Sequence, residues 1–160
     1  MTETSFSFCV TTPHTDLTVT TDGTVALRIE FGKHAERSAR DEIEQLVEDQ
    51  LLEYFGGERK FFTFPYDAKG TELDKTVWTQ VLQIQYGHTK TYGEIARAIG
   101  KPGASRAVGT ANGRNPLPIV VPCHRVVAVG GRLGGFGGGL PLKKRLLDLE
   151  CSQSPILGPE

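Results

Sequence analysis

Residues 115–127 read NPLPIVVPCHRVV and place a cysteine and a histidine between two apolar runs. The first run predicts a strand that ends at Pro122, and VVAV after Arg125 predicts a second strand. A single cysteine is ordinarily just a small buried residue. Here a proline fixes the chain before Cys123 and a histidine follows it directly, so the segment favours a reactive thiol.

A reactive thiol needs help to ionise, because its free pKa of about 8.5 leaves it mostly protonated at pH 7. His124 is the nearest base in the sequence. Neighbouring side chains on a strand face opposite ways, so we expect His124 to act on Cys123 through a turn or a bridging water. A carboxylate must then orient the imidazole, and Glu150, at the end of the last predicted helix, is the candidate.

Two short helices are predicted before this segment. Thr91 and Glu94 form a capping box for the helix TYGEIARAI, and a second helix is expected over residues 104–112. Two short helices across a tight Gly/Pro turn fit a helix-turn-helix, although ordinary αα-hairpins look similar. A longer helix is predicted to begin at Thr71, with Asp74 at its N3 position and Trp78 on its buried face.

The second short helix, ASRAVGTANG, consists of small residues apart from Arg106. A helix that reads bases in the major groove normally offers several long polar side chains. This helix instead suits a narrow groove, contacts to phosphate and insertion of one cation as a wedge. The alternative is a buried packing helix with a snorkelling arginine.

Charge is distributed unevenly along the chain. Residues 1–87 hold 8 basic and 15 acidic side chains, whereas residues 88–150 hold 10 basic and 3 acidic ones. The overall net charge of −1 therefore hides formal charges of −7 and +7. A basic half joined to an acidic half is typical of a DNA-binding module on a carrier domain, unless the asymmetry is incidental.

Glycine is concentrated near the end of the chain. Seven of the 19 glycines lie in residues 130–139, which read GGRLGGFGGG. This stretch predicts a loop whose backbone can approach a ligand closely. It does not match the phosphate-binding pattern that requires a following Lys and Ser or Thr.

The first third of the chain is predicted to be α/β. Strands are expected over residues 5–10, 16–23, 24–32 and 60–64, and a helix over residues 43–55. Residues 64–71 are a candidate connection between domains. We predict no site residue in this part, because Cys9, His14 and His34 lie too far apart in sequence for a metal site to be proposed.

The composition bounds the class of protein. A chain of 160 residues makes one ordinary domain or two very small ones. No apolar run reaches the ~18 residues that a membrane span needs, and the start lacks a secretory pattern. The 3 cysteines form no CxxC pair, so neither a disulfide scaffold nor a cysteine zinc cage is expected. A cytoplasmic protein without membrane contact follows.

The ordered motifs of the second half resemble those of the O6-alkylguanine-DNA alkyltransferases. The resemblance runs from about Thr71 to Glu150 and rests on TYGEIA, SRAVG, NP-x-PI-x-x-PCHRV, the glycine loop and K-x-x-L-L-x-x-E. It implies an α+β fold with an RNase H-like N-terminal α/β domain over residues 1–70. A helical domain with a winged-helix-like helix-turn-helix would occupy residues 71–155, followed by a tail at residues 156–160.

The resemblance also implies an activity: irreversible, single-turnover transfer of an alkyl group from O6-alkylguanine in DNA to Cys123. The base would be flipped out of the duplex from the minor groove, and O4-alkylthymine stays open as a further substrate. No cofactor and no metal are implied, and the chain would act as a monomer on double-stranded DNA.

Individual residues take their expected roles from the same resemblance. The catalytic group comprises the nucleophile, its base, the carboxylate, a tyrosine that donates to guanine N3 and an asparagine that stabilises the turn: Cys123, His124, Glu150, Tyr92 and Asn115. DNA binding is assigned to an arginine finger and its neighbours: Arg106, Ala107, Ser105, Thr91 and Arg114. Substrate contacts are assigned to the pocket walls, to two backbone groups and to a lysine near the tyrosine: Pro118, Phe136, Gly137, Val126 and Lys143.

Phe136 and Gly137 stand where relatives often have Tyr followed by Ser or Ala, so one hydroxyl is missing and larger alkyl groups could be tolerated. Two other classes remain open. A cysteine hydrolase would use Cys123, His124 and Glu150 as a triad but would leave the basic half unexplained. A helix-turn-helix regulator would keep Cys123 as a structural residue.

Overall fold

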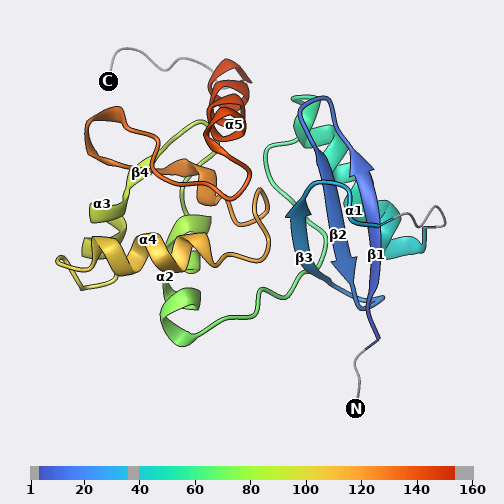
Figure 1. Ribbon diagram of the computed structural model, residues 1–160, viewed down its shortest axis with the longest axis horizontal. Helices are drawn as coiled ribbons and strands as arrows, with labels where there is room; N and C mark the ends of the chain where they lie inside the picture. The colour runs from blue at the N-terminus through green and yellow to red at the C-terminus, as the bar shows by residue number, and fades with distance from the viewer. Residues whose placement is uncertain (1–3, 36–39, 154–160) are drawn as a thin grey trace.

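The computed structural model describes residues 4–35 and 40–153, which form a sheet region followed by a helical region (Figure 1). The sheet region holds β1 (Phe6–Thr11), β2 (Asp16–Thr21), β3 (Ala26–Phe31) and α1 (Glu42–Phe55). The helical region holds α2 (Glu72–Leu82), β4 (Lys90–Thr91), α3 (Tyr92–Ala98), α4 (Ser105–Gly113), η1 (Cys123–Arg125), β5 (Val126–Val127), η2 (Val129–Gly131) and α5 (Leu140–Gln153). The predicted order of a small sheet followed by helices is confirmed, and the predicted tail at residues 156–160 lies outside the described residues.

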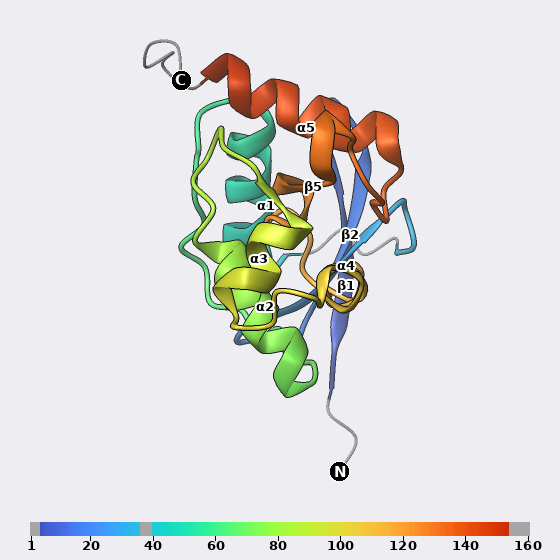
Figure 2. The ribbon, with the colours of Figure 1, turned by 90° about the vertical axis from the view of Figure 1, so that its left-hand side faces the viewer.

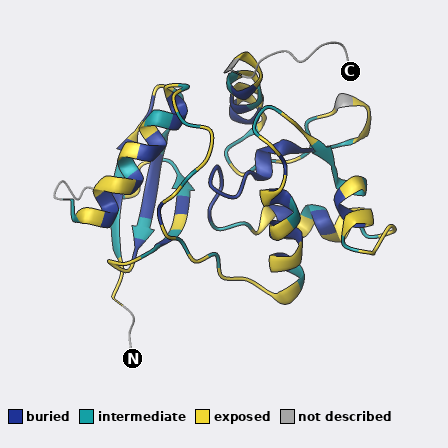
Figure 3. Cartoon of the chain, turned by 180° about the vertical axis from the view of Figure 1, so that it is seen from behind, coloured by how far each residue is buried: buried dark blue, intermediate teal, exposed yellow. Residues whose placement is uncertain are grey.

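The sheet is an antiparallel meander in the order β1–β2–β3. Apolar residues on one face alternate with polar ones, so Val19 of β2 stands opposite Ile29 of β3. The helix α1 begins at Asp41, whose side chain accepts a hydrogen bond from the Glu44 N–H. Figure 3 shows that α1 turns a buried face to the sheet and an exposed face outward.

The strand predicted over residues 60–64 is wrong, because this segment is irregular. A side chain of α1 binds it in place of a neighbouring strand. The Thr63 N–H donates to Gln50 Oε1 at 2.9 Å, and Gln50 Nε2 donates to Thr63 Oγ1 at 2.6 Å. Phe61 is 72% exposed, so its aromatic side chain does not reflect a buried strand position.

Both predicted capping boxes of the helical region are present. Thr71 and Asp74 cap α2, and Thr91 and Glu94 cap α3. The predicted core role of Trp78 also holds, since the ring is buried and its Nε1–H donates to the Ala111 carbonyl at 2.9 Å. The Trp78 hydrogen bond ties α4 to α2.

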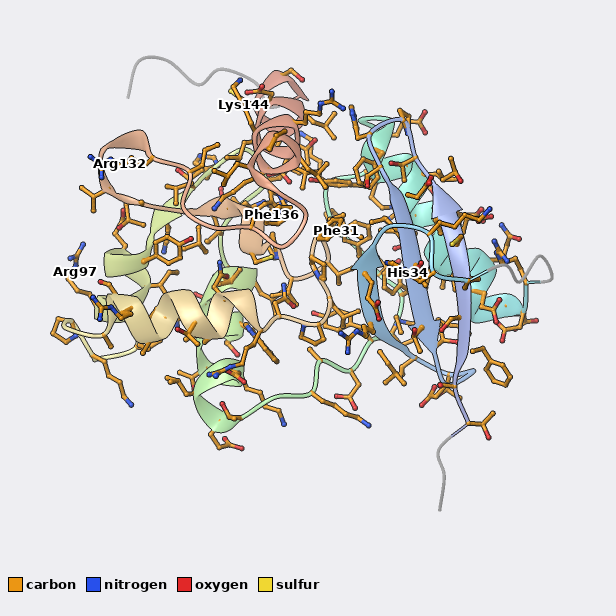
Figure 4. The ribbon with its side chains drawn as sticks, in the orientation of Figure 1. Phe31, His34, Arg97, Arg132, Phe136 and Lys144 are labelled. Carbon is orange, nitrogen blue, oxygen red and sulfur yellow. The ribbon has the colours of Figure 1, made fainter. Side chains whose placement is uncertain are left out.

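The two regions meet along β3 and share one cluster of buried apolar residues. The Ile29 N–H donates to the Pro116 carbonyl at 2.9 Å, which ties the edge of the sheet to the segment before Cys123. The rings of Phe31 and Phe136 lie 5.3 Å apart and meet between the regions in Figure 4. The last helix, α5, runs along the top of the molecule (Figure 2). Within residues 4–35 and 40–153, no helix combines the length and apolar character needed to cross a membrane.

Candidate active site

The segment before Cys123 is a tight turn, and the strand predicted there is wrong. Its prolines lack the N–H groups that a strand would donate to a ladder. The Asn115 side chain closes the turn instead. Its Nδ2 donates to the Val121 carbonyl at 2.8 Å, and its Oδ1 accepts the Leu117 N–H at 2.9 Å.

Ile119 lies inside this turn with a φ of 76°. The left-handed region is strained for a β-branched residue and costs roughly 1–3 kcal/mol. Ile119 is buried, and the Val121 N–H donates to the Leu117 carbonyl across the turn at 2.9 Å. The hydrogen bonds across the turn therefore hold Ile119 in a left-handed conformation that an isoleucine does not favour.

Cys123 begins the single turn of η1, which also contains His124. Its side chain is buried, and its carbonyl accepts a hydrogen bond from Asn112 Nδ2 at 3.2 Å. Burial raises the pKa of the Cys123 thiol, although the Asn115 side chain and the charge of Lys143 oppose that rise. The resting thiol is therefore protonated at neutral pH and needs a base.

A buried polar cluster follows Cys123 and consists of Tyr54, His124, Arg125 and Glu150. Glu150 lies at its centre. Its Oε2 accepts from His124 Nε2 at 2.6 Å and from the Tyr54 hydroxyl at 2.6 Å. Arg125 donates to both carboxylate oxygens, at 2.8 Å from Nε to Oε1 and 3.0 Å from Nη2 to Oε2. The predicted pairing of His124 with Glu150 is thus present as a hydrogen bond.

The protonation states of this cluster follow from its contacts. Burial raises the pKa of Glu150, but hydrogen bonds from His124 and Arg125 and the charge of Arg125 outweigh that effect and lower it to about 2. Burial lowers the pKa of His124 in spite of the neighbouring carboxylate. A neutral His124 that donates Nε2–H to Glu150 keeps a lone pair on Nδ1, which has no hydrogen-bond partner among the described residues.

Cys123 lines a pocket of about 730 Å³. The lining includes seven residues that the sequence assigned to the site: Tyr92, Ser105, Arg106, Asn115, Pro118, Phe136 and Gly137. Glycines of α4 and of the loop after η2 form further parts of the wall. Side chains from four separate stretches of the chain therefore surround the thiol.

Tyr92 is the first residue of α3 and reaches across to the glycine loop. A Cβ built on Gly134 would lie only 2.5 Å from the Tyr92 hydroxyl oxygen, and Gly134 has a φ of 71°. Only glycine fits there without strain. Burial and the Cys123 charge raise the pKa of Tyr92, so its phenol keeps its proton and can donate it. Thr91, which is also a predicted DNA contact, caps α3 with its hydroxyl as predicted.

Lys143 is fully buried and holds the glycine loop to β5. Its Nζ donates to the Val126 carbonyl at 2.7 Å and to the Gly135 carbonyl at 3.3 Å. Burial lowers the pKa of Lys143, and the Cys123 charge opposes this. Val126 and Lys143 thus contact each other, but neither lines the pocket with the other predicted substrate contacts, Pro118, Phe136 and Gly137.

The other residues predicted to bind DNA lie at the two ends of α4. Ser105 and Arg106 line the pocket, and Ala107 is exposed beside them. Arg114 lies at the opposite end of the helix and donates from Nη2 to the buried Asp74 carboxylate at 2.9 Å. The guanidinium of Arg114 thus joins α4 to α2.

The expectation of no site residue in the sheet region is wrong. Tyr54 of α1 belongs to the polar cluster, and Ile29 and Phe31 of β3 line the pocket. Tyr54 shares the buried face of α1 with apolar residues, so its spacing alone indicates only a core position. Arg125 offered a clearer signal, because a cation inside an apolar run requires a buried counter-charge. Within the described residues, no group of His, Cys, Asp or Glu could hold a metal ion.

The site thus combines a buried cysteine that lines a pocket with a neutral histidine, the next residue in the chain, held by a carboxylate. The family model described as the 6-O-methylguanine DNA methyltransferase DNA-binding domain matches residues 72–152. The chain therefore belongs to the 6-O-methylguanine DNA methyltransferase family.

Relatives with similar sequences carry the same name. A methylated-DNA–protein-cysteine methyltransferase of Mycobacterium tuberculosis is 53% identical over 107 residues, which cover 67% of this chain and 65% of that protein. One from Methanosarcina acetivorans is 54% identical over 103 residues, covering 64% and 66%. The aligned stretch thus spans slightly less than two thirds of these relatives.

Solved structures cover almost the whole chain. The crystal structure of Mycobacterium tuberculosis O6-methylguanine methyltransferase has a TM-score of 0.85 at 39% identity and covers 96% of both chains. A structure of Mycobacterium tuberculosis OGT in complex with DNA has a TM-score of 0.82 at 42% identity, covering 92% of this chain and 94% of that one. The similarity therefore extends through the sheet region as well.

Proposed function

We propose that this chain repairs DNA by moving a methyl or other alkyl group from O6 of guanine to Cys123 in one irreversible step. One observation carries the proposal: the Cys123 thiol lines a pocket of about 730 Å³, next to a buried histidine with an unused nitrogen. Relatives named methylated-DNA–protein-cysteine methyltransferases support the same activity.

The first step is removal of the thiol proton. His124 Nδ1 takes the Cys123 proton through a bridging water, and Glu150 stabilises the resulting imidazolium through its hydrogen bond to Nε2–H. The charge of Lys143 and the Asn115 side chain favour the thiolate once it forms. These groups together allow the Cys123 thiolate to form, although burial alone would keep the thiol protonated.

The thiolate then attacks the alkyl carbon. A C–S bond forms as the C–O6 bond breaks, and the electron pair of that bond stays on guanine. Tyr92 donates its hydroxyl proton to guanine N3, and the proton taken from Cys123 restores the phenol, so the balance closes without a cofactor. The product is a thioether that nothing in the site can cleave, so each molecule acts once.

The rest of the assigned contacts hold the base in the pocket. Pro118 and Phe136 form its walls, the Gly137 N–H faces guanine O6, and the Val126 carbonyl faces the exocyclic amine. The last contact requires the carbonyl to share its lone pairs with Lys143. An enclosed thiol cannot reach O6 inside a stacked duplex, so the damaged nucleotide is flipped out.

Binding to double-stranded DNA is proposed for the exposed side of α4. Arg106 enters the base stack of the DNA in place of the flipped nucleotide. The sugar-phosphate backbone of the DNA is contacted by Ser105, Ala107, Thr91 and Arg114. The small side chains of α4 allow close approach to the minor groove. The Mycobacterium tuberculosis OGT whose structure contains DNA is 42% identical to this chain, which supports the assignment.

Finer features of the fold remain part of the proposal. Residues 1–70 would form an RNase H-like domain, and residues 71–155 a domain with a winged helix-turn-helix in which α3 and α4 are the two helices. The antiparallel sheet with α1 on one face and the short β4–β5 ladder are compatible with these assignments. A cytoplasmic monomer is proposed.

The test is a single-turnover assay on a duplex oligonucleotide with one O6-methylguanine. The proposal expects conversion of one lesion per protein molecule and no further conversion when DNA is in excess. Cys123→Ser should remove no methyl group, whereas Cys151→Ser, which alters an exposed thiol, should behave like the parent chain. Repeated turnover, or full activity of Cys123→Ser, would refute the proposal.

A further inference from the structure

The polar cluster draws its members from both regions of the molecule. His124, Arg125 and Glu150 belong to the helical region, whereas Tyr54 comes from α1 beside the sheet. Tyr54 is completely buried, and its hydroxyl donates to Glu150 Oε2 at 2.6 Å. The Tyr54 hydroxyl oxygen also lies 3.5 Å from His124 Nε2. A side chain 96 residues away in sequence therefore contacts the carboxylate that holds the proposed base.

Packing alone does not explain this hydroxyl. The ring of Tyr54 packs against Phe55 and Phe62 at centroid distances of 5.3 and 5.6 Å, contacts that a phenylalanine would make equally well. Burial of a hydroxyl without a partner is costly. The hydroxyl is therefore accounted for by the carboxylate to which it donates.

We propose, on the basis of the function proposed above, that Tyr54 is a positioning residue that fixes Glu150 Oε2 against His124 Nε2. Oε2 receives donors from Tyr54, His124 and Arg125. With three donors converging on it, the oxygen has one defined place, and the imidazole stays in the tautomer with a free Nδ1. The sheet region thereby takes part in the chemistry of the helical region.

The hydroxyl also sets how strongly Glu150 acts on the imidazole. A carboxylate that gives part of its charge to a phenol stabilises an imidazolium less than one without that donor. The titratable and charged groups around His124 come from α1, the α2–β4 connection, η1 and α5: Tyr54, Tyr86, Cys123, Arg125, Lys143 and Glu150. Burial and the charges of Arg125 and Lys143 lower the pKa of His124, and Glu150 opposes them. Without the phenol, Glu150 would oppose them more strongly. Removal of the hydroxyl should then raise the pKa of His124.

The experiment compares Tyr54→Phe with Tyr86→Phe in the full-length chain. The two rings pack edge to face at 6.3 Å, and the buried Tyr86 hydroxyl makes no hydrogen bond to the described residues. Each variant therefore removes one buried hydroxyl from the same neighbourhood. Single-turnover rates on O6-methylguanine DNA are measured from pH 5 to pH 9.

Tyr54→Phe should slow transfer at pH 7 by about tenfold, on the scale of one hydrogen bond to a charged group. The acid limb of its pH profile should move to higher pH, because His124 becomes protonated earlier. Tyr86→Phe should match the parent chain in both respects. A Tyr54→Phe profile equal to that of the parent would overturn the proposal.

A second measurement does not depend on repair activity. Nitrogen-15 NMR of the histidine rings, with the His124 signals assigned through His124→Gln, reports the tautomer and the pKa of His124 directly. The parent chain should show Nε2–H, and Tyr54→Phe should show a raised pKa or a mixture of tautomers. Unchanged His124 signals in Tyr54→Phe would refute the positioning role even if the parent chain transfers methyl groups. A parent chain that transfers none, with His124 signals altered in Tyr54→Phe, would refute the proposed repair function while supporting the Tyr54 contact.

Discussion

The polar cluster includes the two residues that follow Cys123, and the pocket is lined by Cys123 itself, but the two are built from different kinds of residues. The cluster consists of four buried side chains, three of which donate short hydrogen bonds to the fourth, Glu150. The pocket is lined by small residues of α4, by glycines and by the paired rings of Phe31 and Phe136. In the proposed reaction, proton transfer therefore requires fixed hydrogen-bond partners, whereas binding of the base requires space and close approach of the backbone.

The largest effect on the comparison is expected from Glu150→Gln, which breaks the cluster. The change leaves the Arg125 cation buried without its counter-charge, a situation that costs roughly 3–5 kcal/mol. Urea unfolding should show a much lower midpoint. Asp148→Asn on the same helix is the control, because Asp148 and Lys144 are paired in solvent and such pairs contribute about 0–1 kcal/mol. An equal fall of the urea midpoint in both variants would show that the buried cluster stabilises the fold no more than the exposed Lys144–Asp148 pair does.

A smaller effect is expected from Gly134→Ala, which alters the pocket and leaves the cluster intact. The added Cβ would collide with the Tyr92 hydroxyl and would require a left-handed backbone that costs an alanine about 1–2 kcal/mol. We expect transfer to slow by about tenfold. Gly135→Ala, where a Cβ meets nothing within 4 Å, should have a much smaller effect in the same single-turnover assay. Similar rates for the two variants would contradict the proposed role of Tyr92.

The smallest effect is expected from Arg106→Ala at the mouth of the pocket. Loss of one cation should slow repair of duplex DNA by less than about tenfold and reduce the salt dependence of binding by about one phosphate contact. Reaction with the free O6-methylguanine base should be unaffected. Arg28→Ala, at an exposed position on β3, removes the same charge from the sheet region and serves as the control. Equal slowing on duplex and free base would refute the finger role.

The features that the sequence predicts correctly are those that local signals encode. The PCHRV motif, the capping boxes of Thr71 and Thr91 and the glycine loop all depend on residues close together in the chain. The pairing of His124 with Glu150 was also predicted, since a buried imidazole base requires a carboxylate and the last helix offers one.

The failures involve either a local turn or contacts between distant parts of the chain. The run before Cys123 is apolar enough for a strand, but Asn115 and the prolines turn it, and Ile119 adopts a left-handed backbone. The aromatic run at residues 60–64 is bound by Gln50 and not by another strand. Tyr54 could not be found because its place opposite Glu150 depends on how α1 meets α5, which no local pattern encodes.

Peptide mass spectrometry shows directly whether Cys123 accepts the alkyl group. After reaction with O6-methylguanine DNA and digestion with trypsin, the peptide that ends NPLPIVVPCHR should gain the mass of one methyl group, with fragment ions that place it on Cys123. Peptides that contain Cys9 or Cys151 should be unchanged. A methyl group on either of those thiols, or no added mass on the Cys123 peptide while the DNA loses its lesion, would contradict the account.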